Sequence, residues 1–415
     1  MIRFNYCILL CTLIFAEPSS AQLISIFARE RSGTLPQGRF LVSMVSVNAS
    51  LDSLYGQDGV KKPLSSQFSQ NLTFQKITSE EAVRGRQLAG LLRSNGVALE
   101  DSAGSLSGSI SGSVSGQIPV LGYGLTDEWG IYLSLPVLKF KLHSTYQFTT
   151  SEATKRLVTR LNESDQRSTA LEINRALDTG LENKLHKIGY QWNPDLDKNY
   201  LGDVQVSFLH ILNPRPDSDL RQSLQPFIIL PTSNNAELQD LYGLKAGNGR
   251  LGLGLKYAFE RSLFGRFVFN FSSSATYLLA NHQARRLPSS SSDDLNEEAD
   301  ANTWVAGGEQ FQSQAQVRYL FPRLFGLNLG LQWQRELAER LEGAAYAPAV
   351  YDLGSARTSR ELLSSYASVD LSTIPSFLAG HFWLPALAEL GVGLPLRGRN
   401  SIAEPVIELQ GSLFF

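Results

Sequence analysis

The sequence predicts an all-β fold, a transmembrane antiparallel up-and-down β-barrel of about 12 strands (range about 10–14) with two helical loop insertions. Three observations lead to this prediction. Apolar and polar residues alternate over many segments, the last of these segments ends the chain at Phe415, and no uninterrupted apolar run long enough for a spanning helix follows the first 21 residues. Side chains on a strand point alternately to opposite faces, so each such segment has one apolar and one polar face.

Residues 1–21 have the pattern of a signal peptide, which leaves residues 22–415 as a single barrel domain. Arg3 supplies the positive charge, Ile8 to Ala16 the apolar stretch, and Ser19 to Ala21 the small residues before the cleavage point. A first buried helix is the alternative. Cys7 and Cys11 are the only cysteines, so we expect neither a disulfide nor a cysteine-bound metal after cleavage.

Twelve segments have the alternation and length of membrane-crossing strands. They lie near Gly38 to Asn48, Ser102 to Leu121, Glu128 to Phe148, Gly202 to Leu212, Arg221 to Pro231, Gly249 to Arg261, Gly265 to Asn281, Thr303 to Leu320, Phe325 to Ala338, Ser359 to Thr373, Ala386 to Gly398 and Glu404 to Phe415. Leu106 to Ile118 (LSGSISGSVSGQI) is the strictest case, and we expect its apolar face to contact lipid.

The links between these segments alternate between short and long. With the C-terminus placed in the periplasm, the short links fall on the periplasmic side and the long ones outside, as in outer-membrane barrels. Two long links have helical spacing of apolar residues, at about 78–96 and 151–187. The first carries a capping box of Thr78 and Glu81. Either these insertions narrow the barrel mouth, or they form a solvated external cap.

The polar faces of the strands predict the lining of the lumen. After Pro136 the apolar phase shifts by one residue, which we interpret as a bulge that turns Lys139, Lys141 and His143 inward. The other candidates for binding a solute are Gln310, Gln312, Gln314, Gln316, Arg318, Gln332, Gln334, Glu408 and Gln410. Such a lining tunes which solutes pass, although it could equally be a structural network that closes a small barrel.

Catalysis and cofactors find no support in the sequence. His143 and Ser144 are the only adjacent His–Ser pair, and neighbours on a strand face opposite sides, so we expect no enzyme. The segment beginning at Asp195 departs from a calcium loop at its sixth position, Tyr200, and its twelfth, Val206, so we expect no metal and no other cofactor. A net charge of −2 excludes a basic surface for nucleic acid.

Several stretches resemble the outer-membrane transporter family of the MetA-pathway of phenol degradation, distant relatives of FadL-like channels. They are Pro63 to Phe74, Gln117 to Lys141, Lys187 to Pro194, Asn199 to Leu212, Ser223 to Asn234 and Glu389 to Asn400. The resemblance implies a barrel that transports solutes and carries no catalytic motif.

From the residues and this resemblance we expect a monomer in the bacterial cell outer membrane, surrounded by its lipid. The alternating strand that ends at Phe415 resembles the signal by which the barrel-assembly machinery recognises its clients. The expected function is passive transport of a small, apolar or aromatic solute. The alternative is a surface barrel that transports nothing and binds a partner through its external loops.

Overall fold

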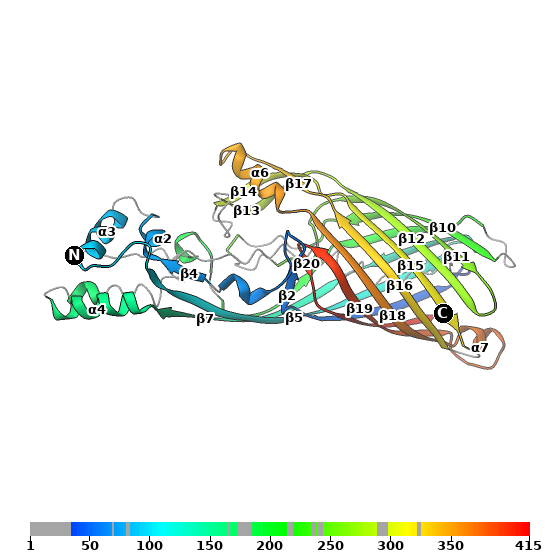
Figure 1. The fold of residues 1–415 in the computed structure, drawn as a ribbon. Coiled ribbons are helices and arrows are strands. Elements are labelled where there is room, and N and C mark those ends of the chain that lie inside the picture. Colours follow the sequence, from blue (N-terminus) through cyan, green and yellow to red (C-terminus); the bar gives the residue numbers. More distant parts are fainter. Residues whose placement is uncertain are drawn as a thin grey trace.

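The computed structural model describes residues 35–415 apart from 69, 80–83, 165–166, 172–184, 192, 214–218, 234–237, 240–243, 289–297 and 322–324. Twelve antiparallel strands close into a barrel in the ring order β1–β21–β19–β18–β16–β15–β12–β11–β10–β9–β6–β5, because β5 pairs with β1 (Figure 1). The predicted all-β barrel and its strand number are confirmed. The predicted signal peptide lies outside the described residues.

The barrel strands have these bounds: β1 Phe40–Ser50, β5 Ser102–Gly124, β6 Trp129–Ser134, β9 Val204–Ile211, β10 Leu220–Leu230, β11 Gly252–Ser262, β12 Phe267–Leu278, β15 Gln310–Leu320, β16 Phe325–Glu336, β18 Arg360–Ser372, β19 Ala386–Arg399 and β21 Val406–Phe414. Short links and the C-terminus lie at one end of the barrel (Figure 1). Only the link after Ser372, which carries α7 (Ile374–Leu378), is longer there.

One part of the sheet continues well beyond the barrel at the opposite end. The first half of β5 pairs with β7 (Val137–Thr150), which in turn pairs with β8 (Asp195–Leu201). We call these three strands the arm; Figure 1 shows that it carries α3 (Arg84–Ser94) and α4 (Glu152–Glu163) at its far end. β4 (Gln70–Thr73) and α2 (Phe74–Ser79) lie in the same region.

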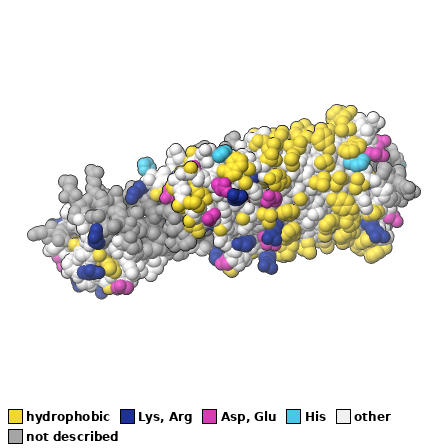
Figure 2. Space-filling view, turned by 90° about the horizontal axis from the view of Figure 1, so that it is seen from above, with side chains coloured by type: hydrophobic (Ala, Val, Ile, Leu, Met, Phe, Trp, Pro, Cys, Tyr) yellow, Lys and Arg dark blue, Asp and Glu magenta, His cyan; other side chains and the backbone are white. Residues whose placement is uncertain are grey.

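The outer surface of the barrel is an apolar belt. On β16, Phe325, Leu329 and Leu331 are each more than half exposed, whereas the alternate residues Gln332 and Gln334 are buried on the lumen side. Figure 2 shows exposed apolar side chains as a broad band across the face of the barrel in view. An apolar surface of this size is stable in hydrocarbon and costly in water, so the belt marks the membrane-spanning zone.

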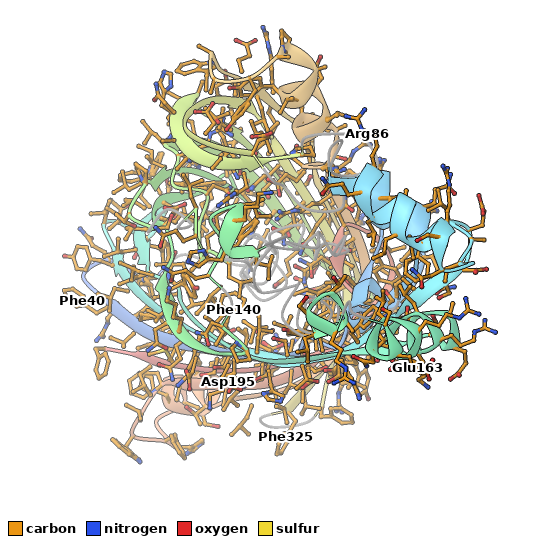
Figure 3. All side chains as sticks on the ribbon, turned by 90° about the vertical axis from the view of Figure 1, so that its left-hand side faces the viewer. Phe40, Arg86, Phe140, Glu163, Asp195 and Phe325 are labelled. Atoms are coloured by element: carbon orange, nitrogen blue, oxygen red, sulfur yellow. The ribbon has the colours of Figure 1, made fainter. Side chains whose placement is uncertain are left out.

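In the arm the apolar side chains face inward and the polar side chains face outward, which is the opposite of the barrel. Our expectation that the apolar face of Leu106 to Ile118 contacts lipid is therefore wrong. Ile110, Val114 and Ile118 are at most 5% exposed and face inward, while Ser109 and Ser111 face solvent. In Figure 3 Phe140 likewise lies on the inner side of the sheet and Asp195 on the outer side. Water surrounds the arm, so its outward face is polar and its inward face packs on loops.

The predicted bulge at Pro136 is also wrong. β5 keeps one register against β6 and β7, since Val120 pairs with Ser134 and Gln117 with Val137, and odd-numbered residues point outward on both sides of Pro136. The apolar phase changes because the strand passes from lipid into water. The irregular site is Gly202–Asp203, between β8 and β9, where the register against the neighbouring strand shifts by one residue.

Gly202 and Asp203 anchor this break. The Gly202 N–H donates to the Pro136 carbonyl at 2.8 Å, and a Cβ on Gly202 would lie 2.5 Å from the Pro136 ring, so only glycine permits the approach. The Asp203 carboxylate accepts the backbone N–H groups of Ser233, Asn248 and Gly249 at 2.7–3.0 Å. These bonds fix the start and end of the external loop between β10 and β11.

Helices occur within both predicted insertions, while residues 80–83, 165–166 and 172–184 of these insertions lie outside the described residues. Residues 78–96 contain the end of α2 and the whole of α3. The Thr78 hydroxyl donates to the Gln75 carbonyl inside α2, so Thr78 does not cap a following helix. Glu81, the other residue of the predicted capping box, lies outside the described residues. In residues 151–187, the Ser151 hydroxyl caps α4 by accepting the Thr154 N–H at 3.1 Å. No helix in the described ranges is long and apolar enough to cross a membrane.

Shorter elements surround the mouth of the barrel. β2 (Ser53–Tyr55), β3 (Lys61–Pro63) and β20 (Ser401–Ile402) form a small sheet, which is followed by η1 (Leu64–Phe68). A second external sheet contains β13 (Asn281–Leu287), β14 (Glu298–Gly307) and β17 (Glu339–Glu342), with α6 (Pro348–Ala356) packed on it.

Candidate functional site: the barrel lumen

The lumen has one predominantly polar wall. It consists of the inward-facing side chains of β15, β16 and β18, which are neighbours in the ring. They include Gln310, Gln312, Gln314, Gln316 and Arg318 on β15, Gln332, Gln334 and Glu336 on β16, and Arg360, Ser364, Tyr366, Ser368 and Asp370 on β18. We call this set the polar wall.

The periplasmic half of the polar wall is cross-linked by an ionic network. Arg318 donates to both carboxylate oxygens of Asp370, from Nε at 3.1 Å and from Nη2. The Asn328 amide donates to Asp370 Oδ2, which also accepts from Arg318 Nε, and to the Ser368 hydroxyl, each at 3.0 Å, and Ser368 donates to Glu389 at 2.6 Å. This part of the bore is therefore polar, rigid and charged on both signs.

Tyr366 lies at mid-height and is held by two of the predicted glutamines. Its hydroxyl accepts from the Gln314 amide at 2.7 Å and donates to the side-chain oxygen Oε1 of Gln316. A small hollow that is open to solvent lies beside this pair and is lined by seven residues, Gln314 and Gln316 among them. Hydrogen-bonding groups therefore border this hollow of the bore.

Glu408 and Gln410 also face the lumen, from β21. The Gln410 amide donates to the Ser43 hydroxyl at 3.4 Å and the Ser412 hydroxyl at 3.3 Å, and Ser412 donates to Ser43 at 2.8 Å. The two bonds to Ser43 cross the seam between β1 and β21, where the two ends of the barrel sheet meet. They are contacts that close the ring.

The opposite side of the lumen is apolar. Val45, Val47, Val114, Leu138 and Phe140 are each at most 6% exposed and form one cluster. Side chains from the loops fill this cluster at the mouth: Leu64 of η1, Leu185, Tyr190 and Leu244. In the twelve-membered ring β1 and β5 are four to six places from β15 and β16, so the part of the cluster on β1 and β5, which we call the apolar wall, lies across the bore from the polar wall, whereas Leu138 and Phe140 belong to the arm.

Three predicted lumen residues do not face the lumen. Lys139, Lys141 and His143 lie on the outer face of β7, where Lys139 pairs with Asp197 at 2.9 Å and His143 Nδ1 lies 2.6 Å from Asp195. The alternate residues Leu138, Phe140 and Leu142 occupy the inner face. The prediction that these three residues form a cationic stripe in the lumen is therefore wrong. Outside the membrane, the apolar residues of β7 take the inward positions.

Several residues that shape the bore were not among the sequence candidates. Asp370, Glu389, Tyr366 and Arg360 all face inward. The alternation within Ser359 to Thr373 carried the signal for the residues on β18, because its even-numbered positions, apart from Leu362, are polar or aromatic. Arg250 lies within the predicted strand Gly249 to Arg261, on the face opposite Leu251 and Leu253, but its full burial depends on contacts distant in sequence.

Arg250 belongs to a row of charges at the outer rim. Its guanidinium donates to the carbonyls of Leu278, Leu279 and Gly307 at 2.9–3.0 Å and to Glu339 at 3.3 Å, and Arg285 donates to Glu339 at 3.1 Å. Burial lowers the pKa of Arg250, the Glu339 carboxylate opposes that effect, and Arg285 adds to it. The row joins the barrel rim to the β13–β14–β17 sheet.

The structure places the two residues considered for catalysis on opposite faces of β7. His143 is exposed while Ser144 is 1% exposed on the other face, which confirms that the pair cannot converge. No group of three or more acidic, histidine or cysteine side chains in the described ranges has metal-binding geometry.

Comparison with known proteins gives similarity in fold. No family model matches the chain, and no curated protein matches it. The COG4313 outer membrane channel from Pseudomonas putida F1 has a TM-score of 0.51 at 13% identity and aligns over 92% of this chain and 98% of its own. The fold that the family resemblance implied is therefore present.

Two further solved barrels are less similar. The P. putida toluene transporter TodX has a TM-score of 0.35 at 9% identity, covering 96% of this chain and 92% of its own. The CymD monoaromatic hydrocarbon channel has a TM-score of 0.33 at 8% identity, covering 92% and 89%.

Proposed function

We propose that this protein is a passive outer-membrane channel for small organic solutes that carry both an apolar and a polar part. The observation that carries the proposal is the two-sided bore, in which the apolar wall faces the polar wall. The COG4313 fold likeness supports a channel, and nothing in the proposal requires catalysis.

In this proposal the mouth opens when the loop between β1 and β5 moves. η1 holds Leu64 in the apolar cluster at 1% exposure, and the small sheet before it is tied down by Lys61, which donates to the Ala403 carbonyl at 2.9 Å and pairs with Glu404 at 3.3 Å. Both contacts lie at the rim. α3 and α4 lie far along the arm instead, so they are not the elements we expect to gate the bore (Figure 1).

Liposome swelling with small uncharged solutes tests the proposal. We expect slow swelling with the wild-type chain and faster swelling with Leu64→Asp, because a buried carboxylate expels η1 from the mouth. Ser66→Asp is the matched control, since Ser66 lies on the exposed side of the same turn. If neither the wild type nor Leu64→Asp admits any solute, the alternative is favoured, a surface barrel that binds a partner through its external loops.

A further inference from the structure

The outer end of the polar wall contains hydrogen-bonding groups that the described protein does not satisfy. Gln334 is 5% exposed, and neither its amide nitrogen nor its oxygen has a partner among the described residues. The Gln310 amide nitrogen and two nitrogens of Arg360, Nε and Nη1, are also buried without a hydrogen-bond partner in the described ranges. Buried polar groups are normally hydrogen-bonded, so such a concentration points to a ligand.

These three side chains are neighbours on the lumen face. Gln310 on β15 and Arg360 on β18 both pair in register with Glu336 on β16. Gln334 is the next inward-facing residue on β16 and therefore lies diagonal to both, within reach of long side chains. Four nitrogens and one oxygen without hydrogen-bond partners among the described residues thus lie close together. Because the nitrogens are donors and outnumber the single acceptor oxygen, they favour a ligand that accepts hydrogen bonds.

The charges near these groups favour a negative ligand. A row runs from Arg285 through Glu339 and Arg250 to Glu336 and Arg360, with ion pairs of 3.1 Å, 3.3 Å and, at its end, 4.0 Å between Glu336 and Arg360. Glu336 also acts electrostatically on Arg250. Three guanidinium groups face two carboxylates in this row, so one positive charge is uncompensated within it, and Arg360 has the loosest pair.

We propose that Arg360, Gln334 and Gln310 form a binding site for the oxyanion of a small organic anion. The guanidinium Nε and Nη1 of Arg360 donate to the oxyanion, and the two amide nitrogens complete its shell. The apolar wall across the bore accepts the organic part. The inference deepens the proposed function, on which it rests, by naming the solute as an anion.

Calorimetric titration of the purified full chain in detergent tests this site. Benzoate is the probe, and benzyl alcohol, which has the ring without the oxyanion, is its neutral counterpart. We expect benzoate to bind at least tenfold more tightly than benzyl alcohol, and Arg360→Gln to weaken benzoate at least tenfold. Lys141→Gln on the outer face of the arm is the matched control and leaves benzoate affinity unchanged.

Gln334→Leu serves as the second variant, because it keeps the side-chain size and all charges in case Arg360→Gln does not fold. It should weaken benzoate at least tenfold and leave benzyl alcohol unaffected. Equal benzoate affinity in the wild type and the variants, or no benzoate binding by the wild type, overturns the site. A chain that swells liposomes but fails this test keeps the channel and loses the site, whereas binding without swelling keeps the site and loses the channel.

Discussion

The reversal of sidedness between barrel and arm can be tested by placing one charge in three environments. Leu329→Arg puts a guanidinium at the centre of the lipid-facing stripe of β16, where the wild-type side chain is 56% exposed. Ser111→Arg puts it on the outward face of the arm, and Ile110→Arg, one residue earlier, on the inward face at 5% exposure. All three positions lie within strands.

The expected free energies of unfolding differ widely. An arginine near the bilayer midplane costs about 2–4 kcal/mol, which lowers the folding equilibrium constant about 30- to 700-fold. Ser111→Arg should change the free energy by no more than about 0.5 kcal/mol, since its side chain stays in water. Ile110→Arg should cost several kcal/mol, because it buries an unpaired charge in the apolar cluster.

Urea unfolding from lipid vesicles, followed by tryptophan fluorescence, measures these differences. A cost for Ser111→Arg as large as that for Leu329→Arg would show that the arm's serine face lies in hydrocarbon. The reasoning about the membrane boundary would then fail. A tolerated Ile110→Arg would show that the inward face of the arm is not packed.

Three further predictions concern the outer rim and the external sheet. Glu339→Gln should destabilise the fold by about 3–5 kcal/mol, because it leaves Arg250 buried without its carboxylate. Glu342→Gln, which breaks an exposed ion pair with Arg340, should cost less than about 1 kcal/mol. Equal urea midpoints for the two variants would contradict the stabilising role of the charge row. Gln334→Leu should stabilise the unliganded chain by about 1–3 kcal/mol by removing unsatisfied groups, and a loss of stability would mean that they have partners. Burial raises the pKa of Asp300, but the hydrogen bonds from Tyr351 and the Asn302 N–H outweigh it and hold that pKa below its ordinary value. The stabilisation is therefore full at neutral pH and is lost as pH falls below about 4 towards the lowered folded value; Tyr351→Phe should flatten this acid limb, and an unchanged pH profile would contradict the assignment.

Sequence by itself determined the architecture of the barrel. The two-residue period of a strand is a local property, so the alternation located the barrel strands without knowledge of their partners. The same reasoning placed Gln310 to Arg318 on one face of β15 and Glu408 with Gln410 on one face of β21, and all of them line the bore. The alternation of short and long links fixed which end of the barrel carries the loops.

Only the tertiary structure decided which face of each strand met which environment. A strand with lipid outside and one with a packed core inside show the same alternation, so the sequence of β5 and β7 could not reveal that their outward side is wet beyond the belt. That depends on Leu64, Leu185 and Leu244 arriving from other loops to cover the inner side. The charge row depends on similar distant contacts, since Arg250 and Glu339 lie 89 residues apart. Such ion pairs form only when folding brings distant parts of the chain together, so the local alternation of apolar and polar residues cannot predict them.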